Sequence, residues 1–366
     1  MNKLLFTFLL LFCLLKESKG QWVTIPDTNF VNWLTLNYPA CMNGNQMDTT
    51  CNEIVNETSV DCSHQFIHDL NGIQYFDNLD SLNCSNNYSV TTPPHFPNSL
   101  TYLDCNMDGI TSFTSLPNSL TFLNCEYNLL FTLPSLPNTL KLLNCFHNNL
   151  TSLPALPNSL LDLDCSFNQL STLPTLSNNI ESLSFCVNNV WTLPDLPNSI
   201  TVLLCNNNHL LSFPDLPDSL TNFQCADNLY LMCLPQLKKI VNFIFDNTGI
   251  TCLPNYPINN TSSFPTLSSV PLCATFNPNS CPDYSGVTNQ DNNLQISIYP
   301  NPVTSQLTIT NLPANSVVQL LDITGRVLFN QTSTTSKLII DMSAFPSGIY
   351  LLKTNEGVKK VVLYAE

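Results

Sequence analysis

The stretch LPNSLTFLNCEYN, residues 116–128, decides the fold because its pattern returns every 20 residues along the middle of the chain. Its second apolar position recurs at Leu100, Leu120, Leu140, Leu160, Ile180, Ile200, Leu220 and Ile240. Another apolar residue follows three positions later, a cysteine or phenylalanine two positions after that, and in most copies an asparagine three positions further on. Self-similarity at a fixed period of this length indicates a stack of like structural units.

The residue type at each repeated position predicts the conformation of one repeat. The apolar residue and the cysteine are separated by one residue, so both point from a short strand into a narrow interior, where cysteine acts as a small hydrophobe. The asparagine amide can bond backbone groups where the chain leaves the strand. Prolines in segments such as 133–139 exclude a helical return path. We therefore expect a mainly β, helix-poor solenoid with a parallel β ladder.

The repeats extend over residues 58–255 and make about ten turns, because two less regular copies precede the eight regular ones. The pattern L-x-x-L-x-C-x-x-N resembles the short, LPX-type leucine-rich repeats of secreted bacterial proteins. This resemblance implies the solenoid fold and leaves the ligand open. Since a solenoid needs capped ends, we expect an N-terminal cap at residues 21–57 and a C-terminal cap and linker at residues 256–291.

The N-terminus has the composition of an export signal. Residues 1–20 contain an apolar run from Leu4 to Leu15 and end in a polar stretch, which is typical of a secretory signal peptide and short for a membrane span. No later segment has eighteen uninterrupted apolar residues, so we expect no transmembrane segment in the mature chain. In the cap, Asp27 or Thr28 is expected to begin one short helix.

Cysteines fall into two groups. Eight of them occupy the repeated position and are expected to be buried thiols. An exported chain can also form disulfides, and we expect neighbours outside the ladder to pair: Cys41 with Cys51, Cys233 with Cys252, and Cys273 with Cys281. Cys186 is left without a partner in this scheme and is either an exposed free thiol or an inert one, with the inert thiol favoured. No pair of cysteines has zinc-ligand spacing, so no metal site is expected.

From residue 292 the sequence changes to short alternating strands with turns between them, which predicts a small antiparallel β-sandwich. Its motifs resemble the C-terminal sorting domain of type IX secretion. The residues that carry this resemblance are Tyr299, Pro300, Asn301, Pro302, Gly325, Gly348, Ile349, Tyr350, Lys359 and Lys360. The resemblance covers residues 292–366. It implies delivery by the type IX machinery to the outer surface of a Gram-negative bacterium or to the medium, commonly with removal of the domain.

Composition excludes several functions. The chain has 26 acidic and 11 basic side chains, a net charge of −15, so it repels phosphate backbones and no nucleic-acid partner is expected. No phosphate-binding loop or hydrolase motif occurs, and we expect neither a cofactor nor enzymatic activity. Asp162 and Asp164 share a strand face and could be read as a glycosidase pair. An open ladder gives them no pocket, which favours a solvated pair.

The outward side chains of the ladder are the candidate binding residues. They are expected on the concave face at Tyr102, Asp104, Phe122, Tyr127, Phe146, His147, Asp162, Asp164 and Phe167. Aromatic clusters on a surface that is otherwise solvated are typical of recognition sites. We therefore predict a non-enzymatic exported protein that binds an extracellular protein or glycan. The alternatives are a structural surface adhesin without a defined ligand and, less favoured, the scaffold of a glycan-acting enzyme.

Overall fold

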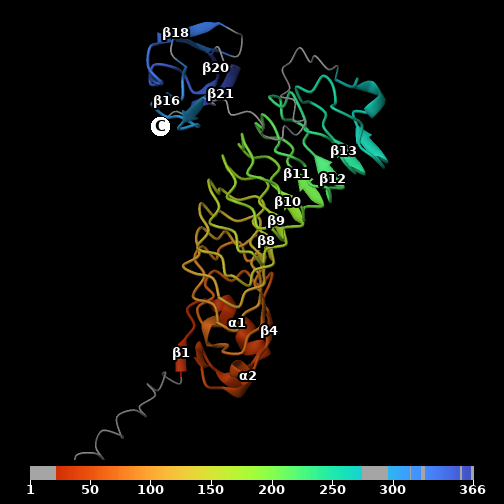
Figure 1. Ribbon diagram of the computed structural model, residues 1–366. Helices are drawn as coiled ribbons and strands as arrows, with labels where there is room; N and C mark the ends of the chain where they lie inside the picture. The colour runs from red at the N-terminus through yellow and green to blue at the C-terminus, as the bar shows by residue number, and fades with distance from the viewer. Residues whose placement is uncertain (1–21, 274–295, 314, 323–325, 355–356, 364–366) are drawn as a thin grey trace, which may run out of the picture. The chain divides into compact units, whose positions relative to one another are not determined.

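The structure is a computed structural model that describes residues 22–273, 296–313, 315–322, 326–354 and 357–363. The chain divides into two compact units, residues 1–284 and residues 285–366 (Figure 1). The expected signal peptide at residues 1–20, together with Cys281 and Gly325, lies outside the described residues. Within the described residues, no helix combines the length and the apolar character needed to cross a bilayer.

The first unit begins with a small cap closed by a disulfide. Its elements are β1 (Trp22–Thr24), α1 (Thr28–Asn37), η1 (Pro39–Cys41), β2 (Met42–Asn43), β3 (Gln46–Asp48) and α2 (Asn52–Val55). Asp27 begins α1 as expected, because its Oδ1 accepts a hydrogen bond from the backbone N–H of Phe30 at 2.7 Å. The disulfide between Cys41 and Cys51 spans the β2–β3 hairpin and confirms that predicted pairing.

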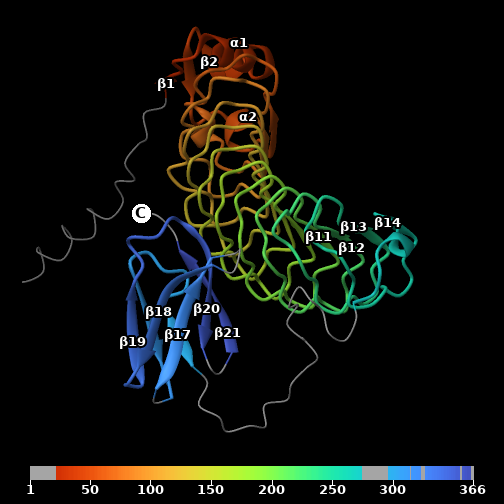
Figure 2. The same ribbon diagram turned by 90° about the horizontal axis from the view of Figure 1, so that it is seen from above.

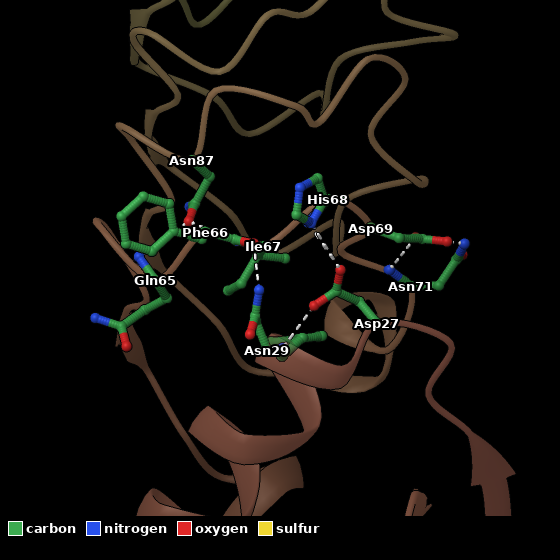
Figure 3. Close-up of polar contacts among 10 residues, drawn as sticks. Asp27, Asn29, Gln65, Phe66, Ile67, His68, Asp69, Asn71 and Asn87 are labelled. Carbon is green, nitrogen blue, oxygen red and sulfur yellow. Dashed lines mark hydrogen bonds and ion pairs between the residues drawn. The ribbon is translucent and has the colours of Figure 1, made fainter.

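Asp27 also joins the cap to the first repeat (Figure 3). Its Oδ2 accepts from the backbone N–H of His68 at 2.9 Å, and the ring Nδ1 of His68 lies 3.5 Å from the same oxygen. Asn29 donates from Nδ2 to the carbonyl of Phe66 at 2.6 Å. Because both oxygens of this buried carboxylate are used, Asp27 holds the start of the helix and the first repeat at the same time.

Eleven short strands form one parallel sheet along the first unit. They are β4 (Ser59–Asp61), β5 (Ser81–Asn83), β6 (Tyr102–Asp104), β7 (Phe122–Asn124), β8 (Leu142–Asn144), β9 (Asp162–Asp164), β10 (Ser182–Ser184), β11 (Val202–Leu204), β12 (Asn222–Gln224), β13 (Asn242–Ile244) and β14 (Ser262–Phe264), with the 3-10 turns η2 (Ile73–Tyr75) and η3 (Leu267–Ser269) beside them. From β6 to β14 successive strands pair at equivalent positions of the repeat, so Phe122 faces both Tyr102 and Leu142. Figure 2 shows the turns of this unit stacked one after another, from the cap that contains α1 to the turns of β13 and β14.

The interior contains the predicted positions. Strand centres such as Leu123 and the cysteines that follow, such as Cys125, are fully buried. The eight cysteines at this position are free thiols, and burial raises their pKa well above the ordinary value, which keeps them protonated. Between β6 and β13 the return paths contain turns and extended segments without a helix. These observations confirm the helix-poor solenoid.

Buried asparagines tie successive turns together. Asn168 donates from Nδ2 to the carbonyls of Cys145 at 3.0 Å and Cys165 at 3.1 Å, and its Oδ1 accepts from the N–H of Leu150 at 2.9 Å. The equivalent bonds recur at Asn128, Asn148, Asn188, Asn208 and Asn228. Each amide therefore satisfies buried backbone groups of two neighbouring turns, the role that the sequence predicts.

The ladder continues one strand beyond residue 255, the expected end of the repeats. Strand β14 pairs with β13 in the same parallel register, so that Ser263 stands opposite Phe243. Its serines lack the apolar signature, and the backbone pairing alone identifies the strand. The apolar pattern of the repeat is thus lost before the ladder ends.

Two predicted disulfides are wrong because the pairing follows the ladder rather than the sequence. Cys252 is bonded to Cys273, which excludes the pairs Cys233–Cys252 and Cys273–Cys281. A parallel bridge between Leu253 and Leu272 places those two segments side by side, and the Cα atoms of the bonded cysteines are 4.9 Å apart. Cys233 is also disulfide-bonded.

The second unit is the predicted antiparallel sandwich. Its strands are β15 (Ser297–Tyr299), β16 (Gln306–Thr310), β17 (Ser316–Leu321), β18 (Val327–Ser333), β19 (Lys337–Asp341), β20 (Gly348–Thr354) and β21 (Gly357–Leu363). They form a three-stranded sheet in the order β15-β16-β19 and a four-stranded sheet in the order β18-β17-β20-β21. Buried residues of both sheets, among them Leu307, Val318 and Leu352, make one core.

Candidate binding surface

The outward side chains of the parallel sheet and of the residues just after its strands form one surface, which we call the ladder face. On β6 to β9 the first strand residues are Tyr102, Phe122, Leu142 and Asp162, and the third are Asp104, Asn124, Asn144 and Asp164. All eight are half-buried, whereas the middle residue of each strand is buried. The rings of Tyr102 and Phe122 stack with centroids 4.3 Å apart and planes 9° apart. The ladder face therefore carries one stacked pair of rings, Tyr102 and Phe122, beside a polar strip.

Bulky residues occupy a left-handed backbone position at the edge of this surface. The residue before the asparagine column has a positive φ in successive turns: 56° at Met107, 52° at Tyr127, 52° at His147, 55° at Phe167 and 54° at Val187. This conformation costs a residue other than glycine about 1 kcal/mol, and asparagine tolerates it best. Asparagine stands at the same place in two later turns, Asn207 and Asn247. The aromatic residues at this left-handed position are therefore not the residue types that its backbone conformation favours.

Four aromatic side chains meet at this edge, and we call Tyr127, Phe146, His147 and Phe167 the aromatic ridge. Ring centroids lie 4.8 Å apart for Tyr127 and His147, and 5.2 Å apart for Tyr127 and Phe146. Phe146 and Phe167 are separated by 4.9 Å. Tyr127 and Phe167 nevertheless remain 41% and 43% exposed. The rings support one another and still present surface to a partner.

Carboxylates and amides are fixed next to the ridge. Oδ1 of Asp104 accepts from the Nδ2 groups of Asn106 at 2.7 Å and Asn124 at 3.1 Å. Glu126 accepts from Nδ2 of Asn144 at 2.8 Å. Because amides of neighbouring turns hold these carboxylates, their negative charge has a defined position on the ladder face.

The predicted acidic pair, Asp162 and Asp164, lies on the same face of β9. Burial raises the pKa of Asp162, a hydrogen bond with Ser182 opposes this shift, and the charge of Asp164 adds to it. Oδ1 of Asp164 accepts from the backbone N–H of Ser166 at 2.9 Å. Both side chains are half-buried, and they add negative charge to the surface beside the ridge.

A second group of rings, which the periodicity of the sequence does not reveal, lies outside the ladder face. Trp191, His209 and Tyr230 come from three successive turns, with centroids 4.9 Å apart for Trp191 and His209 and 5.4 Å apart for Trp191 and Tyr230. They stand three, one and two positions after the asparagine of their own repeats. Because they do not share one position of the repeat, an alignment by columns does not bring them together.

In the second unit, Asn301 joins the two ends of the sequence motif. Its Nδ2 donates to the carbonyl of Lys360 at 2.9 Å, and its Oδ1 accepts from the N–H of Val362 at 2.9 Å. The hydroxyl of Tyr350 donates to the carbonyl of Pro346. The structure thus brings the segment at Tyr299–Pro302 against the last strand, although the two are about sixty residues apart.

Residues 297–363 match the sequence model of the family described as the secretion system C-terminal sorting domain. The match spans all seven strands of the second unit. Together with the solenoid, it defines the class of protein: an exported leucine-rich-repeat protein that carries a type IX sorting domain and is located at the cell surface or in the medium.

Several solved structures are similar to this chain. YopM from Yersinia enterocolitica is 28% identical, with 51% of this chain and 50% of that chain covered and a TM-score of 0.43. YopM from Yersinia pestis, described as a leucine-rich effector protein, is 25% identical over 56% of this chain and 70% of that chain, with a TM-score of 0.45. InlJ from Listeria monocytogenes, whose functional domain includes a cysteine ladder, is 18% identical over 95% and 99%, with a TM-score of 0.39. The chain therefore spans about half the length of the first of these structures. No curated protein sequence matches it.

Proposed function

We propose that this exported protein is a non-enzymatic binding protein that contacts an extracellular partner through its ladder face. The contact would centre on the aromatic ridge and extend to the stacked rings of Tyr102 and Phe122. One observation carries this proposal: aromatic side chains stand in the left-handed position at Tyr127, His147 and Phe167, although asparagine suits that backbone better and is used there in later turns. Backbone strain of this kind is concentrated at functional sites.

The charge beside the ridge favours a protein partner with exposed lysine or arginine side chains. Asp104, Glu126, Asp162 and Asp164 flank the rings, and aromatic faces themselves attract such cations. Long-range attraction by a chain of net charge −15 would speed the encounter. A glycan is the second candidate for this surface, because rings between amides also suit sugar stacking.

The remaining parts serve delivery in this proposal. Residues 1–20 would direct export from the cytoplasm, residues 21–57 and 256–291 would cap the solenoid and link it to the sandwich, and residues 292–366 would engage the type IX machinery. A structural adhesin without a defined ligand is the alternative function. That alternative needs no aromatic side chain at Tyr127 or Phe167, so the two functions can be separated by substitution.

The test replaces Tyr127, His147 and Phe167 by asparagine in one variant. The full chain is immobilised and exposed to solubilised surface proteins at low and physiological salt, and captured proteins are quantified. We expect a partner that binds at least tenfold less well to the variant and more weakly at higher salt. Phe131→Ala, which removes an aromatic side chain that is 60% exposed outside the ladder face, is the matched control. Equal capture by the triple variant would contradict the proposal.

A further inference from the structure

We propose a second binding site, for uncharged polysaccharide chains, along the side of the solenoid next to the ladder face. Its centre is the group of Trp191, His209 and Tyr230, which we call the side platform. Its continuation is a row of polar side chains in the preceding turns. This site is independent of the partner proposed for the ladder face.

The side platform presents nearly parallel rings. The plane of Trp191 is inclined by 21° to that of His209 and by 23° to that of Tyr230. Tyr230 is 43% exposed and the neighbouring Leu229 is 62% exposed. Rings held in parallel by their neighbours lose little conformational freedom on binding, and the C–H faces of pyranose rings pack against such a surface.

One ring nitrogen of His209, Nδ1, is buried without a polar partner among the described residues. Burying a polar atom in this way is unfavourable by about 1–3 kcal/mol. The stacking with Trp191 at 4.9 Å is therefore maintained against a cost, and an exposed asparagine, Asn189, occupies the same position one turn earlier.

Amide and hydroxyl side chains continue from the platform toward the N-terminus. They are Asn149, Gln169 and Asn189 in one column and Thr151 and Ser171 in the column two positions further on. All are exposed except Asn149, which is half-buried. The columns repeat once per strand, about 4.8 Å apart. A row of donors and acceptors at a regular spacing suits a ligand whose hydroxyl groups also repeat along a chain.

The absence of charge along this side indicates the kind of polysaccharide. Apart from the imidazole of His209, none of the platform or row residues is acidic or basic, in a chain whose net charge is −15. Lys141 is the single lysine or arginine between positions 101 and 230, so the row offers no fixed positive charge to sulfate or carboxylate sugars. A cationic ligand would be drawn instead to the carboxylates of the ladder face. An uncharged polysaccharide fits the side platform best.

The experiment is native affinity electrophoresis of the full chain in gels that contain dextran, mannan, laminarin or xylan, with alginate as an acidic comparison. We expect at least one neutral polysaccharide to slow the protein. Trp191→Ala should raise the dissociation constant for the polysaccharide in that gel at least tenfold, and Tyr230→Ala should raise it at least threefold. Thermal unfolding of each variant establishes that it is folded, and the more exposed Tyr230 decides the outcome if Trp191→Ala does not fold.

Two control variants test whether the retardation comes from the side platform. Trp22→Ala removes an indole that is 41% exposed in the N-terminal cap and should leave the retardation unchanged. The triple asparagine variant of the ladder face should also be retarded like the original protein, so failure of one proposal does not decide the other. The side platform would be refuted if no neutral polysaccharide slowed the protein, if alginate alone did, or if folded Trp191→Ala and Tyr230→Ala were slowed as strongly as the original.

Discussion

The buried and exposed positions of the repeats differ in how far their residues vary. Inside, asparagine returns at the same place in six successive turns, from Asn128 to Asn228, with the same hydrogen bonds. Outside, the adjacent left-handed position holds Tyr127, His147 and Phe167 in three turns and Asn207 in a later one. Every turn must satisfy the same buried backbone groups, whereas the outer side chains have no such common task. Variation at the exposed repeat positions therefore indicates which side chains of the solenoid have a role other than stabilising the fold.

The largest expected effect on stability comes from Asp108, which stands at the repeat position where the six following turns have a buried asparagine. Asp108 is fully buried; its Oδ1 accepts from the N–H of Asn87 at 2.8 Å, and the thiol of Cys84 donates to Oδ2 at 3.5 Å. Burial raises the pKa of Asp108 to about 7, from an ordinary value of 3.8. The folded protein therefore holds this proton between about pH 4 and pH 7, where the unfolded chain releases it.

It follows that the free energy of unfolding falls as the pH rises through this interval. With about 1.4 kcal/mol for each unit of pKa, the full loss from this group is roughly 4 kcal/mol above pH 7. Asp108→Asn should restore the amide of the other turns and remove this dependence. We expect the variant to exceed the original in stability by several kcal/mol at pH 8 and to differ little at pH 4, as measured by urea unfolding.

The reverse substitution sharpens this comparison. Asn168→Asp places a carboxylate in a regular turn and should introduce a similar fall in stability between pH 4 and pH 7. Parallel stability curves for Asp108→Asn and the original protein across this interval would show that Asp108 is ionised in the folded state without penalty.

The second prediction compares two adjacent asparagines. Asn188 donates to the carbonyls of Cys165 and Phe185 and accepts from the N–H of Leu170 at 2.9 Å, whereas Asn189 is exposed. Asn188→Ala leaves the buried N–H of Leu170 without its acceptor and should lower the free energy of unfolding by about 3 kcal/mol.

Asn189→Ala is the matched control and should change that free energy by less than about 0.5 kcal/mol. Urea unfolding at neutral pH measures both. If the two substitutions had equal effects, the buried amides would not hold the turns together.

The same contrast explains how much of the structure the sequence predicts. The buried leucine, cysteine and asparagine positions are predictable because each repeats its task at a fixed spacing. The serine of LPNSL is not, since the hydroxyl of Ser119 donates to the carbonyl of Leu100 at 2.7 Å, a contact between turns that a single repeat does not display. The bond between Cys252 and Cys273 depends on the ladder continuing after its apolar signature is lost.

The candidate sites are predictable to a different degree. The ladder-face rings align by column, so their clustering can be read from the periodicity. The side platform cannot be read in this way, because Trp191, His209 and Tyr230 stand at different positions of their repeats. Only the path of the chain after each strand brings them together. An alignment of the repeats by column predicts contacts between residues at the same repeat position. It misses contacts between residues at different positions of neighbouring repeats.

The smallest expected effect concerns the outer position itself. Tyr127→Asn gives the left-handed backbone the residue that suits it, at the expense of part of the aromatic ridge. We expect the free energy of unfolding to rise by up to about 1 kcal/mol, less the loss of ring contacts with Phe146 and His147, while partner binding weakens. Tyr102→Asn, at an ordinary strand position, should bring no such gain. Urea unfolding and capture of the partner, measured on the same preparations, provide the test. A Tyr127→Asn variant that is less stable than the original by more than about 1 kcal/mol would mean that the ridge is part of the packing, and its strained backbone would no longer indicate a binding site.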